Sequence, residues 1–368
     1  MSKSKLAVLT ATAAALASVS LPTTEAHALQ FVPCSATALR NAITLANNVP
    51  GPEVLVLSFG CTYTLTAADN PGNGLPQVTS QINITGNGAT IRRQQTPPAP
   101  SFPIPVTDFR IFQVSGPNGR LTLNNLTVRD GRSTSSGDGG GGIFVGAGSA
   151  LTLNSVEVTR NAAGVTGPGG GIQNYGTLTL NNSTVSYNFA QDEGGGIGSE
   201  GTATISNSTI TGNTSRNGGG GMAATGSLTF TNSRLTDNAT HDWGGGLVAR
   251  NLTGTLTDAL VRGNSAIQTG GSPDGGGIRT SGVTTLTLER TTVFANRSLG
   301  QGGGGGIANG PGDTVNLRNS SVTHNYAQVG TAGGISNDAA GTVTLTATPV
   351  VENFPSNCAP TVVPGCAF

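Results

Sequence analysis

The chain has 368 residues, of which 57 are glycine, 35% are hydrophobic and 4% are aromatic. Its 18 Lys plus Arg balance its 18 Asp plus Glu, and without a basic run it lacks the charged face of a nucleic-acid-binding protein. Large apolar residues are too few for one wide globular core, yet Val, Ile, Leu and Thr recur too regularly for a disordered chain. A solenoid, which buries a narrow core coil by coil, satisfies both observations.

The segment 1–28 has the layout of a secretory signal peptide. Lys3 and Lys5 precede an apolar stretch at 6–21, and the small-residue triplet Ala-His-Ala follows at 26–28. The apolar stretch is too short, and too often interrupted by Thr and Ser, for a membrane anchor. We therefore expect cleavage after Ala28, an extracellular location and no membrane span. The mature chain would be free of lysine, with 16 arginines against 17 acidic residues.

Four cysteines lie near the two ends of the chain: Cys34 and Cys61, then Cys358 and Cys366. An even number in an exported chain indicates disulfides, and four cysteines allow three pairings. We favour the two local pairs, because each would tie down one end of an elongated molecule. No C-x-x-C motif occurs and no histidine neighbours either pair, so we expect no metal site and no cofactor.

A Gly-rich turn followed by an aliphatic residue recurs along the chain at intervals of about 25 to 31 residues, which is the signature of a repeat architecture. The aliphatic positions are Ile143, Ile172, Ile197, Met222, Leu247, Ile278, Ile307 and Ile335. Short segments of alternating hydrophobicity separate the turns, which indicates three strands and three turns per coil. The expected fold is all-β: a right-handed, single-stranded parallel β-helix of about ten coils, in which Ile172, Ile197, Met222 and Leu247 stack in one buried column.

Asparagines mark two further rows. Each coil ends in an aliphatic residue, two variable residues and an asparagine. These asparagines are Asn161, Asn188, Asn213, Asn238, Asn264, Asn296, Asn325 and Asn353. Six residues earlier, Asn182, Asn207, Asn232 and Asn319 form a partial second row, with Asp258 and Arg290 in two coils. Asparagine tolerates left-handed backbone and stacks into hydrogen-bonded ladders, so we expect a structural role for both rows.

The expected division of the chain is a signal peptide at 1–28, an N-terminal cap with the first strands at 29–80, the β-helix at 81–354 and a disulfide-closed C-terminal cap at 355–368. The segment 38–47 places Leu39, Ala42, Ile43 and Ala46 on one helical face, which predicts a short helix over the open end of the first coil. The first strands are expected at 54–59 and 62–66.

The segment Leu39-Arg40-Asn41-Ala42-Ile43, followed by Ala46-Asn47, resembles the N-terminal cap of secreted bacterial right-handed β-helix repeat proteins. The segment 82–88 is similar to their first rung. The repeated G-G-G-I and aliphatic-x-x-Asn motifs resemble the G-G-A-I and F-x-x-N motifs of the polymorphic outer-membrane protein adhesins. The resemblance covers about 34–358 and implies the fold far more specifically than a function. Asn353 is followed only by the short segment 354–368, so no autotransporter barrel is expected.

The pectin lyase-like fold also includes pectate lyases and polygalacturonases. The N-T-D, D-D, G-H-G and R-I-K motifs of the polygalacturonases are absent, and the mature chain lacks the lysine that pectate lyases often use. Its two histidines, His241 and His324, lie in different repeats. Our leading interpretation is a monomeric, non-catalytic, adhesin-like protein that binds a surface or matrix ligand, with carbohydrate as the candidate. The alternative is a polysaccharide lyase or glycoside hydrolase, and a purely structural role is the third possibility.

One row of polar residues is a candidate ligand site. Asp192, Asn217 and Asp242 recur at 25-residue spacing, just before the glycine turns. Stacking would place Asp192 and Asp242 about 9.6 Å apart, twice the strand spacing, close to the upper end of the roughly 6.5 to 9.5 Å carboxylate separation of inverting glycosidases.

The residues that flank this row are Glu193, Arg216, His241 and Trp243, the only tryptophan. An exposed Trp beside carboxylates suits a sugar-binding groove, whereas the competing interpretation is ordinary turn chemistry with Trp243 packed on the rod. Insertions at 69–76, 94–108 and 265–274 are further candidates.

Overall fold

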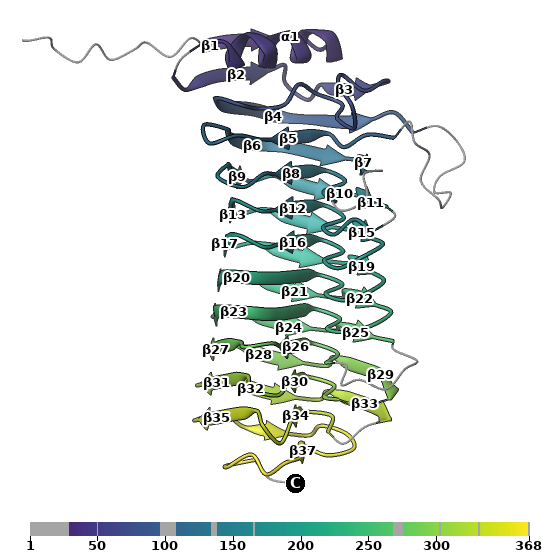
Figure 1. The fold of residues 1–368 in the computed structure, drawn as a ribbon, viewed down its shortest axis with the longest axis vertical. Helices are drawn as coiled ribbons and strands as arrows, with labels where there is room; N and C mark the ends of the chain where they lie inside the picture. The colour runs from purple at the N-terminus through teal and green to yellow at the C-terminus, as the bar shows by residue number, and fades with distance from the viewer. Residues whose placement is uncertain are drawn as a thin grey trace, which may run out of the picture.

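The computed structural model describes residues 29–49, 51–95, 108–133, 138–164, 166–267, 275–301, 303–329 and 332–366. The predicted signal peptide lies outside these ranges. The described chain is a rod of about ten stacked coils with parallel strand pairing, covered at its N-terminal end by one helix (Figure 1). The predicted parallel β-helix is thereby confirmed.

The N-terminal end is closed by helix α1 (Ala36–Asn47). The Ser35 hydroxyl accepts a hydrogen bond from the Ala38 amide at the helix start, and the apolar face predicted from the sequence is buried against the first coil. Strand β1 (Leu29–Val32), which we did not predict, precedes the helix and pairs with β2 (Glu53–Leu57); β3 (Thr62–Leu65) follows. The expected Cys34–Cys61 disulfide joins this cap to the first coil.

Three columns of parallel strands run the length of the rod. The first column contains β5 (Phe112–Val114), β8 (Ile143–Val145), β12 (Ile172–Asn174), β16 (Ile197–Ser199), β20 (Met222–Thr231), β23 (Leu247–Thr257), β26 (Ile278–Ser281), β30 (Ile307–Asn309), β34 (Ile335–Asn337) and β37 (Cys358–Pro360). The second contains β4 (Gln81–Arg93), β6 (Arg120–Arg129), β9 (Ala150–Asn154), β13 (Thr177–Asn181), β17 (Thr202–Ser206), β27 (Thr285–Glu289), β31 (Thr314–Arg318) and β35 (Thr342–Thr346). The third contains β10 (Glu157–Thr159), β14 (Thr184–Ser186), β18 (Thr209–Thr211), β21 (Arg234–Thr236), β24 (Leu260–Arg262), β28 (Thr292–Phe294), β32 (Ser321–Thr323) and β36 (Val350–Val351). The long strands β20 and β23 pass through the corner between the first two columns, and β4 and β6 pass through the corner between the second and third.

A separate eight-stranded parallel sheet forms in the last turn of the coils. Its strands are β7 (Arg132–Ser133), β11 (Ala162–Ala163), β15 (Phe189–Ala190), β19 (Thr214–Ser215), β22 (Ala239–Thr240), β25 (Ser265–Ala266), β29 (Arg297–Gln301) and β33 (Tyr326–Val329). The sequence did not predict these strands, because many have only two residues. The insertion expected at 265–274 consequently begins inside strand β25, and its segment 268–274 lies outside the described ranges.

The interior of the rod follows the predicted repeat. Ile172, Ile197, Met222 and Leu247 are paired in successive strands, and each is at most 1% exposed. The predicted column is therefore confirmed. Each such side chain contributes roughly 1.5 to 3 kcal/mol through burial, so the stability of the rod is distributed over many coils.

The two asparagine rows have different structural roles. In the first row Asn213 is fully buried, donates to the Asn238 Oδ1 at 3.0 Å and accepts from the Asn188 backbone amide at 2.9 Å. In the second row Asn207 is exposed and has a φ of 49°, in the left-handed region that asparagine tolerates. The first row is a buried ladder, and the second row allows the chain to turn.

The ends of the 94–108 insertion are joined by a buried ion pair. The Arg93 guanidinium lies 2.8 Å from the Asp108 carboxylate, and Arg132 contacts the same carboxylate at 3.3 Å. The segment 96–107 lies outside the described ranges. The insertion is therefore anchored where it leaves and rejoins the rod.

The predicted disulfide at the C-terminal end is also present. Cys358 and Cys366 are bonded, and Val363 between them is buried. Segment 355–368 does more than cover the last coil, because β37 pairs with β34 and extends the first column by one strand.

Candidate functional site

The polar row before the glycine turns is in register. Glu193 pairs with Gly218, and Gly218 pairs with Trp243, as isolated parallel bridges between successive coils. One residue earlier, the Asn217 side-chain amide donates to the Asp192 carboxylate at 2.9 Å. The 25-residue spacing therefore stacks these turns, although the assignment of a ligand to them stays a prediction.

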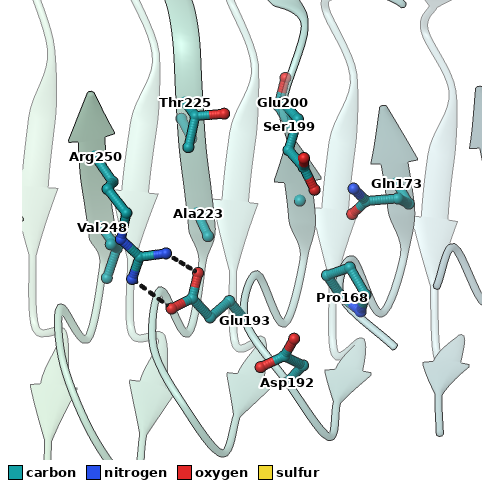
Figure 2. A pocket seen from close by; sticks show the side chains of 12 residues that line it. Pro168, Gln173, Asp192, Glu193, Ser199, Glu200, Ala223, Thr225, Val248 and Arg250 are labelled. Carbon is teal, nitrogen blue, oxygen red and sulfur yellow. Dashed lines mark hydrogen bonds and ion pairs between the residues drawn. The ribbon is translucent and has the colours of Figure 1, made fainter. Parts of the chain in front are cut away.

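A hollow of about 430 Å³ lies beside this row, and we call it the lateral hollow. It lies on the outer face of β12, β16, β20 and β23 (Figure 2). Its walls and floor are formed by Pro168, Gln173, Asp192, Glu193, Gly198, Ser199, Glu200, Ala223, Ala224, Thr225, Val248 and Arg250. Two of the predicted site residues, Asp192 and Glu193, belong to it.

The floor of the hollow results from small side chains at one outward-facing position of the repeat. In register, this position is occupied by Phe144, Gln173, Gly198, Ala223 and Val248 in successive coils. Larger side chains thus flank a two-coil stretch where glycine and alanine leave the strand surface open. The depression is a consequence of residue size, since residues 173, 198, 223 and 248 stay in register and the strand register shifts only beyond Ala224.

Gln173 is the least expected member of the hollow. Its side chain is fully buried, and although the amide lies close to the Tyr175 hydroxyl, neither its nitrogen nor its oxygen makes a hydrogen bond of regular geometry with any described residue. The amide extends over the neighbouring strand, because a Cβ placed on Gly198 would lie 2.0 Å from the Gln173 Oε1. Leaving a buried amide without partners costs about 1 to 3 kcal/mol for each group. A ligand in the hollow would supply the missing partners.

Glu193 is held by an arginine two coils away along the rod. The Arg250 Nη1 donates to Glu193 Oε2 at 3.0 Å and its Nη2 donates to Oε1 at 2.6 Å (Figure 2). This bidentate pair raises the pKa of Arg250, with the Glu193 hydrogen bond as the largest cause. The sequence did not indicate Arg250 as a site residue. It lies outside the glycine turns that carry the polar row, and 57 residues separate it from Glu193.

A second carboxylate enters the hollow from Glu200. Figure 2 shows the Glu200 carboxylate, the Asp192 carboxylate and the Gln173 amide directed toward the same space. Tyr175, whose ring packs on Phe144 at a centroid distance of 5.7 Å, is a neighbour of this space. Burial, followed by the charge of Glu200, raises the pKa of Tyr175, while the polar interaction of its hydroxyl with the Gln173 amide lowers that pKa.

The other predicted site residues lie outside the lining. Arg216, Asn217 and His241 are exposed on the turns, whereas Asp242 and Trp243 are half-buried. Burial, then the nearby charge of Glu193, raises the pKa of Asp242. The Trp243 indole N–H is buried and has no hydrogen-bond partner among the described residues, which agrees with the interpretation that Trp243 packs on the rod and not with a fully exposed sugar-stacking indole. Tyr175, a neighbour of Glu200, is therefore a better aromatic candidate for the hollow than Trp243.

Residues 169–349 match the family described as "Right handed beta helix region". The chain is a right-handed parallel β-helix. No curated protein and no solved structure matches it significantly. Apart from Pro168, the residues that line the lateral hollow lie within the matched part of the β-helix, so its coils belong to the regular repeat and not to an added domain.

Within the described ranges, no three His, Cys, Asp or Glu side chains come together in a way that would hold a metal ion. None of the helical residues there forms a segment long and apolar enough to cross a membrane.

Proposed function

We propose that this protein is an extracellular, non-catalytic glycan-binding β-helix whose binding site is the lateral hollow. The observation that carries the proposal is the buried Gln173 amide, whose donor and acceptor are both without partners in the hollow. The two disulfides support an oxidising, extracellular environment. The adhesin-like motifs of the repeat support attachment to a surface or matrix ligand, with the protein acting as a monomer.

The polar character of the hollow favours a sugar over an apolar ligand. An amide offers two donors and an acceptor, and ionised carboxylates such as Asp192 and Glu200 accept hydrogen bonds. Sugar hydroxyls donate and accept, so one ring can satisfy both kinds of group. The floor over Gly198 and Ala223 leaves room for a ring against the strands, and Tyr175 is a neighbour of the lining residues Gln173 and Glu200.

Two of the three carboxylates of the hollow already have side-chain hydrogen-bond partners, which argues against catalysis by either of them. Both oxygens of Glu193 accept from Arg250, and Asp192 accepts from Asn217. A retaining or inverting glycosidase needs one free carboxylate base or nucleophile and one carboxylic acid. One observation favours hydrolysis as a second candidate function: the raised pKa of Asp242 is the direction found in a general acid.

The test is a panel of soluble oligosaccharides offered to the purified protein, with binding measured by calorimetry and product release by chromatography. We expect binding without new reducing ends or unsaturated products. Gln173→Ala should remove binding, whereas Glu157→Gln, on an exposed position of β10, should not change it. Turnover that is lost in Asp242→Asn would establish the hydrolase instead, and absence of binding to every oligomer would refute the glycan proposal.

A further inference from the structure

The lateral hollow has an excess of negative charge. Its lining contains three carboxylates, Asp192, Glu193 and Glu200, and one guanidinium, Arg250. Arg250 donates two hydrogen bonds to Glu193, and its charge acts more weakly on Asp192. Asp192 has only the neutral Asn217 amide as a side-chain hydrogen-bond partner. Neither Asp192 nor Glu200 therefore forms an ion pair with a described residue, since the ion pair of the lining joins Arg250 to Glu193.

Acidic residues alone would be an ordinary solvated surface, but the hollow also contains the buried Gln173 amide. The amide and the Glu200 carboxylate point into the same space (Figure 2). Burial raises the cost of leaving Gln173 unpaired, and a ligand group that fills the space must both accept and donate hydrogen bonds. A sugar hydroxyl meets the amide requirement, and a positive charge on the same molecule would balance the two carboxylates.

We propose that the lateral hollow selects an amino sugar with a free, protonated amine over neutral sugars and over uronates. This inference rests on the proposed glycan function and names its ligand class. The amine pairs with the Glu200 carboxylate, a ring hydroxyl bonds to the neighbouring Gln173 amide, and Asp192, at the other end of the hollow, adds negative charge (Figure 2). A uronate carboxylate in the same position would be repelled by both acidic side chains, which separates this hollow from a site for pectin-type polymers.

The experiment compares four probes by calorimetry at low ionic strength and mildly acidic pH: a glucosamine tetramer, its N-acetylated counterpart, an oligogalacturonate and tetralysine. The two sugar tetramers differ in the amine alone. We expect the glucosamine tetramer to bind about tenfold more tightly than the acetylated one, with the oligogalacturonate weakest and tetralysine not bound. Added salt should reduce the preference, because part of it comes from exposed charges.

Glu200→Gln provides the residue-level test. It should weaken binding of the glucosamine tetramer by about three- to fivefold, as expected for a partly exposed ion pair, and weaken the acetylated tetramer less, because that sugar has no amine to pair with Glu200. Glu157→Gln is the matched control on another face of the rod. Equal or tighter binding of the acetylated tetramer or the oligogalacturonate would overturn the selectivity and leave glycan binding intact. Binding of tetralysine alone would also overturn it, and no binding of any sugar would refute the proposed function itself.

Discussion

The Gln173 side chain occupies the space that a side chain on residue 198 would need: a Cβ built on Gly198 lies 2.0 Å from the Gln173 Oε1. The two residues are register partners in β12 and β16, so a side chain at either position extends into the same space on the outer face of the sheet. The absence of a side chain at residue 198 is what allows the Gln173 amide to extend across the neighbouring strand into the hollow.

Gly198→Ala should consequently displace the Gln173 amide. We expect glycan affinity to fall at least tenfold, with a stability cost below about 1.5 kcal/mol, because the displaced atom is the end of a side chain. Calorimetry and chemical denaturation would measure the two effects. Gly146→Ala is the matched control, since its Cβ would have 3.3 Å to its nearest neighbour. Unchanged affinity in Gly198→Ala would contradict the role of this pair.

The two asparagine rows should respond differently to the same kind of substitution. Asn213→Ala removes a side chain that links Asn188 to Asn238 and also donates to the Val185 carbonyl. Several buried groups lose partners, so we expect a loss of about 2 to 4 kcal/mol in urea denaturation, and Asn213→Gly should be no better.

Asn207 supplies the contrast, because its backbone is left-handed and its side chain is exposed. Asn207→Gly should be neutral within about 0.5 kcal/mol, whereas Asn207→Ala should cost about 1 to 2 kcal/mol. If both substitutions at Asn207 had equal effects, left-handed backbone would not be the reason for asparagine there.

These rows also show how much the sequence could predict. Spacing places each asparagine and each glycine turn in its coil, because every coil must repeat the same backbone path. The spacing cannot predict Gln173, Arg250 or Tyr175 as members of a site, because outward positions vary freely in identity. Their significance depends on the size of neighbours such as Gly198, one coil away. The half-buried state of Trp243 likewise depends on packing between coils, which the repeat pattern does not specify.

Breaking the Arg93–Asp108 ion pair should destabilise the first coils. The Arg93 and Asp108 side chains are only 8% and 5% exposed, and burial is the main cause that lowers the pKa of Arg93. Arg93→Met leaves the buried Asp108 carboxylate with one cationic partner fewer. We therefore expect the free energy of unfolding to fall by about 3 kcal/mol. The double variant Arg93→Met/Asp108→Asn should recover part of that loss, since the uncompensated charge is gone.

Arg290→Met is the control for this experiment, because its ion pair with Asp258 is fully exposed. We expect no measurable change in the denaturation midpoint for that variant. A double variant less stable than Arg93→Met alone would show that the charge on Asp108 is not the source of the loss.

Asp242 should give a pH-dependent contribution to stability. Burial and then Glu193 raise its pKa in the folded protein, so the folded state keeps the proton to higher pH than the unfolded chain does. Stability from this residue is therefore greatest below the unfolded pKa and falls as the pH rises through the raised folded value. Asp242→Asn should increase the free energy of unfolding at neutral pH, by less than about 1 kcal/mol because the side chain is only half-buried and solvent screens its charge.

At about pH 3, where the wild-type carboxyl is protonated in both states, the variant and the wild type should unfold alike. Denaturant titrations at the two pH values would measure this difference. A variant that is less stable than the wild type at neutral pH would contradict the raised pKa.

The most direct test of the binding site is the variant Gln173→Met, studied by thermal unfolding and by oligosaccharide calorimetry. Methionine fills nearly the same volume without the buried amide that lacks partners. We predict that the free protein becomes more stable by about 1 to 2 kcal/mol, because no buried amide is left without hydrogen-bond partners. Sugar affinity should fall at least tenfold, because the ligand loses the hydrogen bonds that the amide makes to it. A variant that is destabilised, or that binds sugar as tightly as the wild type, would contradict a glycan site at Gln173.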